Sequence, residues 1–206
     1  MISANALGNI EEGYQFSILA LKMLDRYDQN LLRSKVNMIH GGFVNHFKLD
    51  ITEDFKYLLD GAYSGYQNGD LEFAGYNILH YIYNYFFSGK PLSEVERECT
   101  YHYNTIKKYR QINSTQAYEL IHQLVVSLGK PSASEMILDG EKFNKSRILP
   151  LWQQANNHSN LGTYYIGTGI LKYYSGDYPA AIIAFAAAKE HLPGVLGMMF
   201  VPFYHF

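Results

Sequence analysis

The sequence has little cysteine, little charge and no long hydrophobic run. Cys99 is the single cysteine among 206 residues, which excludes an internal disulfide and fits a reducing compartment, so we expect a cytoplasmic protein. Charged residues make up 17% of the chain, and the formal net charge is −2. A protein that binds the phosphate backbone needs a basic surface, so we expect no nucleic-acid partner.

Two apolar stretches near the end of the sequence are too short to span a membrane. The run from Tyr178 to Ala188 stops at charged Lys189, and the next run contains Pro193 and Pro202. A membrane-spanning helix needs about 20 consecutive apolar residues. The first thirteen residues carry neither a positive segment nor an apolar segment, so they do not predict a signal peptide. We therefore expect no membrane association.

Motifs of catalysis and metal binding are also missing from the sequence. The eight histidines form neither His-x-x-x-His nor His-Glu-x-x-His, and no Gly-x-Ser-x-Gly nucleophile elbow occurs. Gly167-Thr168-Gly169 lacks the spacing of a phosphate-binding loop and lies within a predicted helix. The sequence thus predicts no catalytic residues, no cofactor and no metal site.

Helical periodicity, in contrast, runs through most of the chain. Apolar residues recur at spacings of three and four, and no Asn-Gly or Asp-Gly hairpin stands between alternating strands. Residues 129–150 hold two glycines and two prolines and are read as a long connection, the best candidate for a hinge. The predicted helices span residues 9–26, 52–68, 71–88, 93–111, 114–128, 150–157, 159–175, 178–191 and 195–206. We expect one all-α domain over residues 1–206.

A helical repeat is visible in residues 165–193, which resemble the tetratricopeptide repeat in residue type and spacing. Small residues at two positions allow the paired helices to approach closely, and a Gly-Asp pair makes the tight turn and caps the second helix. A large and a small residue then pack against the first helix, and a proline ends the pair. These signature residues are Gly169, Gly176, Asp177, Ala181, Phe185, Ala188 and Pro193.

A weaker copy of the repeat lies in residues 61–78. Gly69 and Asp70 form the corresponding corner, Ala74 and Ile78 follow it, and Ala62 stands where the close-packing small residue is expected. The two Gly-Asp corners are about three periods of roughly 34 residues apart. Together the copies predict an α-α superhelix of tetratricopeptide-like hairpins.

Six landmarks occur along the chain, at residues 13–16, 20–24, 69–76, 88–92, 155–157 and 202–204. Their order resembles one family over nearly the whole chain. It is similar to the helical region of large multi-sensor serine/threonine kinases that end in a histidine kinase, common in cyanobacteria. The resemblance implies a segment of a longer protein, placed between an AAA-type ATPase module and sensor domains. No Gly-rich kinase loop, His-Arg-Asp or Asp-Phe-Gly is present, so no enzymatic residue carries over.

Three hypotheses follow from these patterns. The first is a non-catalytic scaffold for protein interaction in signal transduction, which binds a peptide segment or neighbouring domains of the parent chain. The alternative is a helical small-molecule sensor, suggested by the aromatic density of residues 76–87. The third is a helical enzyme whose active site is assembled from distant residues. A homodimer through the apolar end, Met198 to Phe206, is a further expectation because such surface favours association.

Overall fold

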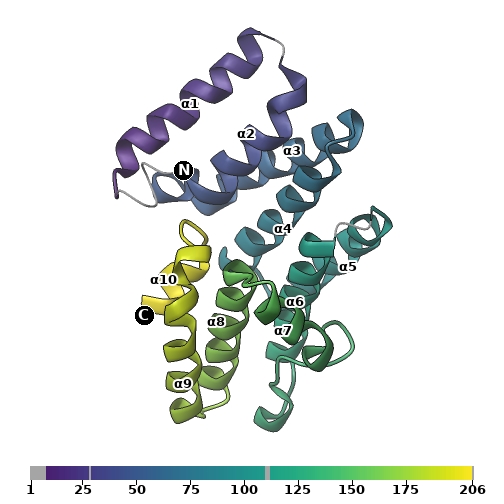
Figure 1. Ribbon diagram of the computed structural model, residues 1–206, viewed down its shortest axis with the longest axis vertical. Helices are drawn as coiled ribbons and strands as arrows, with labels where there is room; N and C mark the ends of the chain where they lie inside the picture. The colour runs from purple at the N-terminus through teal and green to yellow at the C-terminus, as the bar shows by residue number, and fades with distance from the viewer. Residues whose placement is uncertain (1–7, 28, 110–111, 206) are drawn as a thin grey trace. The chain divides into compact units, whose positions relative to one another are not determined.

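The computed structural model describes residues 8–27, 29–109 and 112–205, and these residues form helices, turns and loops without a β-strand (Figure 1). The prediction of an all-α fold is therefore confirmed. Contacts divide the chain into two compact units. Unit 1 comprises Met1–Lys90 and Tyr101–Thr115, and unit 2 comprises Pro91–Thr100 and Gln116–Phe206. No helix in the described part of the chain is long and apolar enough to cross a membrane.

Unit 1 is built mainly from the first four helices. Two 3-10 turns, Asn45–Phe47 and Ile51–Glu53, connect the second helix to the third. Asn9 is the N-cap that precedes the first helix, and its side chain accepts a hydrogen bond from the Glu12 amide at 3.1 Å. The four helices are α1 (Ile10–Arg26), α2 (Asn30–Phe43), α3 (Asp54–Asn68) and α4 (Leu71–Phe87).

Helices α2, α3 and α4 all contact one another, and a glycine allows this close approach. A Cβ atom built on Gly61 of α3 would lie 2.9 Å from Cβ of Asn37 on α2 and 2.8 Å from Cγ of Asn77 on α4. Neither distance is tolerated between real side chains. The packing of three helices at this point therefore requires glycine.

Two helices divide their residues between the units. α5 (Leu92–Lys108) supplies its first part to unit 2 and its second part to unit 1, and α6 (Ile112–Leu128) lies mostly in unit 2. Within unit 2, the Tyr118 hydroxyl of α6 donates a 2.8 Å hydrogen bond to the carbonyl oxygen of Cys99 on α5. This bond satisfies the polar end of a fully buried aromatic side chain.

The rest of unit 2 is a helical cluster with a 3-10 segment, Lys189–Gly194, between its last two helices. Helix α8 packs along α9 and also contacts the 3-10 segment. Large side chains fill its core: Phe143, Ile148 and Trp152 are all buried. Burial of such side chains is the main stabilising contribution in a helical domain. The helices are α7 (Lys145–Gln154), α8 (His158–Tyr174), α9 (Tyr178–Ala188) and α10 (Phe200–His205).

The long connection predicted over residues 129–150 lies within unit 2 and is shorter than expected. It contains one 3-10 turn, Ala133–Glu135, and α7 begins at Lys145. Side chains of α6 hold it in place. The Ser127 hydroxyl donates to the carbonyl oxygen of Ile137 at 2.6 Å, and Gln123 Oε1 accepts from the amide of Lys142 at 3.0 Å. These bonds anchor both halves of the connection to α6.

Candidate functional site

The Gly-Asp corner of the clearer repeat lies between α8 and α9. Gly176 has a φ of +80°, the left-handed conformation that favours glycine. The Asp177 carboxylate accepts a hydrogen bond from the amide of Ala180 at 3.3 Å, and the amide of Asp177 donates to the carbonyl oxygen of Lys172 at 2.9 Å. These bonds end α8 and start α9, and so make a helical hairpin.

The remaining signature residues of this repeat pack the hairpin. A Cβ atom built on Gly169 of α8 would lie 2.7 Å from the Phe185 ring of α9, so glycine makes room for the aromatic side chain. Ala181 and Ala188 are buried. Pro193 lies in the 3-10 segment, five residues after the last residue of α9. The signature residues therefore serve the packing of two helices and line no cleft together.

The corner of the weaker repeat lies between α3 and α4 and is held differently. Gly69 again has a positive φ, of +79°. The Asp70 side chain makes no capping hydrogen bond and instead lies 3.7 Å from the Lys35 ammonium of α2. Ala74 is fully buried, and its Cβ would be 2.9 Å from a Cβ at Gly65. This corner thus contributes to helix packing in unit 1.

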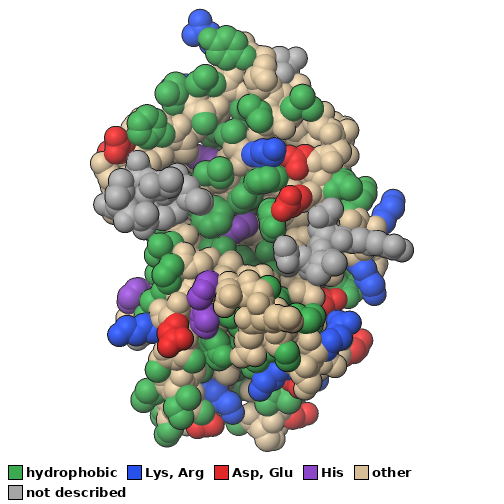
Figure 2. All heavy atoms as spheres, viewed as in Figure 1, with side chains coloured by type: hydrophobic (Ala, Val, Ile, Leu, Met, Phe, Trp, Pro, Cys, Tyr) green, Lys and Arg blue, Asp and Glu red, His purple; other side chains and the backbone are tan. Residues whose placement is uncertain are grey.

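The outer face of α9 in unit 2 exposes apolar side chains. Ile182 and Ile183 are 69% and 71% exposed, and Tyr178 is also exposed, while the alanines of the opposite face are buried. Figure 2 shows hydrophobic side chains over α9 at the lower left of the view. A helix that is apolar all round is normally buried on every side. The outer face of α9 is therefore a candidate docking surface.

Helix α1 of unit 1 carries a second exposed apolar stripe. Phe16, Leu19 and Met23 are each at least half exposed, and their spacing of three and four puts them on one side of the helix. Leu24, which faces the core, is buried. Both units thus present a helix with apolar residues toward solvent.

The exposed apolar surface expected at residues 198–206 differs from what the structure describes. Phe200 is fully buried, and Met198 and Met199 are half-buried. The ring of Tyr204 packs edge-on against Phe185, with ring centres 6.2 Å apart. Phe206 and the side chain of Phe203 lie outside the described residues. The described residues of this end thus pack into unit 2, where Phe200 is buried and Tyr204 contacts Phe185 of α9.

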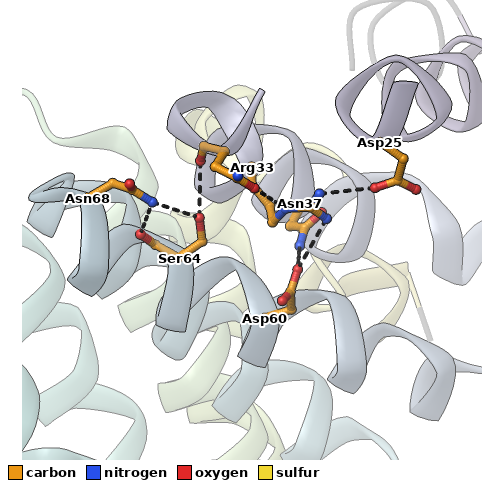
Figure 3. A network of polar contacts seen from close by, with 7 residues as sticks. Asp25, Arg33, Asn37, Asp60, Ser64 and Asn68 are labelled. Atoms are coloured by element: carbon orange, nitrogen blue, oxygen red, sulfur yellow. Dashed lines mark hydrogen bonds and ion pairs between the residues drawn. The ribbon is translucent and has the colours of Figure 1, made fainter. Parts of the chain in front are cut away.

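A cleft of about 400 Å³ opens between α1, α2 and α3 of unit 1. Arg33 occupies it and binds two carboxylates, at 3.0 Å to Asp25 and 3.7 Å to Asp60 (Figure 3). Asn37 is buried, donates to Asp60 at 2.8 Å and keeps an amide oxygen without a hydrogen-bond partner. That oxygen is itself buried, so only a ligand that enters between the lining side chains could bond to it. The residues that line the cleft are Ile18, Leu21, Lys22, Asp25, Arg33, Asn37, Lys56, Tyr57 and Asp60.

The aromatic side chains of residues 76–87, which suggested a sensor, do not line this cleft. Tyr81 and Tyr83 are buried, and the Tyr81 ring packs edge-on against Phe55 and His102. These rings fill the core of unit 1. The cleft is lined instead by residues such as Arg33 and Asn37, which the sequence patterns did not single out.

Buried ionisable groups lie in the core of unit 1, away from solvent. Asp54 is fully buried and accepts hydrogen bonds from Asn45 at 2.7 Å and Asn84 at 2.9 Å. Burial raises the pKa of Asp54, and the neighbouring His46 and Asn45 oppose that shift. Burial also lowers the pKa of His40 to about 4 and that of His80 to about 3. Asp54 thus ties Asn45 and Asn84 together inside the core of unit 1.

The single thiol is inert. Cys99 is fully buried, and burial, with the nearby carboxylates of Glu96 and Glu98, raises its pKa to about 12. A thiol in this state is neither a nucleophile nor a metal ligand at neutral pH.

Within residues 8–27, 29–109 and 112–205, no group of three or more His, Cys, Asp or Glu side chains is arranged to hold a metal ion. Comparisons of the chain with protein-family models, curated proteins and solved structures found no match. The functional argument therefore rests on the surfaces and side chains described above.

Proposed function

We propose that this chain is a non-catalytic scaffold that binds a helical segment of a partner protein on the outer face of α9. The observation that carries the proposal is the exposure of Ile182 and Ile183 on a helix whose other face is already buried. Full burial of an isoleucine side chain contributes about 1.5–3 kcal/mol. Two such side chains in the centre of a contact are enough for the energetic core of an interface.

The chemistry of this face favours an apolar helix as the occupant. No charged residue occurs between Tyr178 and Ala188, and charges of both signs stand at the two ends, Asp177 before the helix and Lys189 after it. A partner helix with apolar residues at positions i, i+3, i+4 and i+7 would match this surface. A charged peptide would lose hydration there without gaining an ion pair.

The partner we propose is a neighbouring domain of the same signalling protein. This part of the proposal is supported by the resemblance to multi-sensor kinases, in which the helical region stands between ATPase and sensor domains. The scaffold would couple those domains in the cytoplasm, and the tetratricopeptide-like superhelix belongs to the same proposal.

The test uses a double variant, Ile182→Lys/Ile183→Lys, with Leu151→Lys as its control. Leu151 lies on α7 of the same unit and is half exposed, so the control adds a charge to an apolar surface position elsewhere. The wild type and the control should capture the same identified partner, and the double variant should lose it by at least about tenfold, equivalent to 1.4 kcal/mol. Circular dichroism checks that all three remain folded.

Equal capture by the double variant would rule out the α9 face as the docking site. Light scattering gives a separate result. A wild-type dimer that becomes monomeric in the double variant would assign this face to a second copy of the chain and overturn the partner-helix proposal.

The cleft of unit 1 supports a second candidate, a helical small-molecule sensor. Its polar centre combines Arg33 with the unpartnered amide oxygen of Asn37. Such a site suits a small ligand that carries both a hydrogen-bond donor and an acceptor. A thermal-shift screen of metabolites should give a stabilising compound whose effect is lost in Asn37→Leu. A flat response across the screen would remove this candidate.

A further inference from the structure

A cleft of about 310 Å³ opens in unit 2 between α8 and the connection that precedes α7. On the α8 side it is lined by Tyr164, Thr168 and Leu171, whose spacings of three and four put them on one face of the helix. Residues 136–139 of the connection line it as well. Small-molecule sites have volumes of about 300–1,000 Å³, so this cleft has room for one small ligand.

The connection holds apolar side chains in place along the cleft. The carbonyl oxygen of Ile137 accepts a hydrogen bond from the Ser127 hydroxyl of α6 at 2.6 Å, yet the Ile137 side chain is 50% exposed. Leu138 is buried, and its Cδ2 atom would lie 3.3 Å from a Cβ atom built on Gly167 of α8. The wall of the cleft is therefore preformed, and a ligand that covers Ile137 removes apolar surface from water.

The charges that line the cleft are two lysines, Lys145 and Lys172, and one carboxylate, Asp139, so its formal charge is +1. The Asp139 carboxylate accepts the backbone amide of Lys145 at 2.9 Å, at the start of α7. Among the described residues no carboxylate forms an ion pair with the Lys145 ammonium. Lys172 lies 3.4 Å from Asp177, and such a partly exposed pair is weak, so its ammonium is available to a ligand as well.

We propose that this cleft binds a monocarboxylate with an unbranched apolar chain, of the medium-chain fatty acid class. The carboxylate of the ligand accepts charge-assisted hydrogen bonds from the lysine ammoniums, and one negative charge matches the formal charge of the cleft. The hydrocarbon chain lies along Ile137 and Leu138 of the connection and the facing side of α8.

A phosphate ester suits this cleft less well than a carboxylate. At neutral pH it carries about 1.5 to 2 negative charges, more than the cleft balances, and the apolar wall offers its oxygens no replacement for water. The proposal also stands apart from the docking surface on α9, because neither Ile182 nor Ile183 lines this cleft.

The experiment titrates the full chain with octanoate and with octanamide and follows both by isothermal titration calorimetry. The two ligands share their hydrocarbon chain and differ in charge. We expect one octanoate per chain, bound roughly fivefold more tightly than octanamide. Lys145→Gln should remove most of that preference, because it takes away the ammonium. Ile137→Asn should weaken both ligands alike, because the hydrocarbon chain loses its apolar wall.

Lys189→Gln is the matched control. Lys189 is an exposed lysine of the same unit, and it does not line the cleft. Its replacement changes the net charge by the same amount as Lys145→Gln and should leave both affinities unchanged. Circular dichroism checks that all three variants remain folded.

A second measurement on the wild-type chain needs no variant. In nuclear magnetic resonance spectra, octanoate should shift the amide signals of Leu138 and Thr168 before those of the rest of the chain. Shifts that gather at Ile182 would place the ligand on the α9 face and overturn the proposal. So would the absence of saturable octanoate binding, equal affinity for the two ligands, or equal effects of Lys189→Gln and Lys145→Gln.

Discussion

The two units differ in what fills their cores. The centre of unit 1 is polar: Asp54, Asn77 and Asn84 are buried and hydrogen-bonded between helices, and Asn84 also donates to the carbonyl oxygen of Gly41 at 2.9 Å. The centre of unit 2 is mostly apolar, with Phe143 and other large side chains excluded from solvent. The same class of helical packing is therefore achieved by two kinds of chemistry.

This difference affects how each core specifies its arrangement. Directional hydrogen bonds between buried side chains fix the alignment of helices, but each unpaired member costs the free energy of its lost hydration. Apolar side chains fix the alignment of helices through their volume and shape, and an apolar core tolerates replacement of a side chain by another of similar size. Unit 1 should accordingly depend on individual polar atoms, and unit 2 on the total volume of its core.

The largest expected effect is on removal of the Asp54 carboxylate. Asp54→Ala removes the acceptor of the buried Asn45 amide and one of the two acceptors of the Asn84 amide, so the free energy of unfolding should fall by about 3–5 kcal/mol. Phe143→Leu in unit 2 keeps most of the side-chain volume and should cost less than about 1.5 kcal/mol. Denaturant unfolding measures both variants. Equal costs would break the distinction between the two cores.

Acid should destabilise both units through their buried histidines. Unfolded histidine titrates near pH 6.5, whereas the folded-state pKa values of His40 and His80 are about 4 and about 3. Between those values the unfolded state binds more protons, so stability falls as pH falls from about 6.5 toward 4. In unit 2, the corresponding buried histidine is His122, with a pKa of about 4.

Asp54 acts in the opposite direction, because a raised folded-state pKa lets the folded state take up a proton more readily as pH falls. With two histidines against this one carboxyl in unit 1, and one histidine in unit 2, we expect each unit to lose roughly 1 kcal/mol per pH unit. Hydrogen exchange of individual amides at pH 6.5 and pH 4.5 is the measurement. Opening free energies of α3 and α8 that stay the same at the two pH values would contradict the expectation.

The close contact between α8 and α9 gives the next effect. Gly169→Ala places a Cβ atom about where the Phe185 ring lies, and such overpacking should cost about 1–3 kcal/mol. A second change, Phe185→Leu, removes part of the ring and should recover stability in the double variant. Thermal unfolding of the two single variants and the double variant gives the coupling free energy. Strict additivity would show that the contact does not matter.

The smallest expected losses of stability come from replacing the aspartate in each of the two Gly-Asp corners. Asp177 caps α9 through its side chain, so Asp177→Ala should cost about 1 kcal/mol, while Asp177→Asn should cost far less. Asp70 makes no capping hydrogen bond, and its exposed partner Lys35 is a weak one, so Asp70→Ala should cost less than Asp177→Ala. Chemical unfolding of the three variants should reproduce that order.

Helix α2 shows why part of the fold was not predictable from the sequence. In Asn30–Phe43 the apolar Leu31 and Leu32 are exposed, while Ser34 and Asn37 are buried. A search for apolar residues at helical spacing misses such a helix because small and polar residues form its inner face. The repeat-bearing helices α8 and α9 were found because glycine and alanine mark their contact in the usual way.

Local signals also misplaced some helix ends. Helix α7 begins at Lys145 and includes Pro150 in its interior, although the proline suggested a start at that point. The helix predicted over residues 93–111 begins at Leu92 and ends at Lys108, and the amide of Glu94 donates to the carbonyl oxygen of Pro91. The Arg33 cleft and the cleft that Ile137 and Lys145 line in unit 2 depend on contacts between distant residues, which no spacing in the sequence reveals.

The most direct test of the scaffold account is photo-crosslinking from position 182 in the cells that make the protein. A photoreactive phenylalanine derivative at Ile182 should give one discrete adduct with another protein domain, identified by mass spectrometry. The same group at Leu151 should give none. Absence of an adduct at Ile182, or the same adduct from both positions, would contradict the proposal that the outer face of α9 is the binding surface.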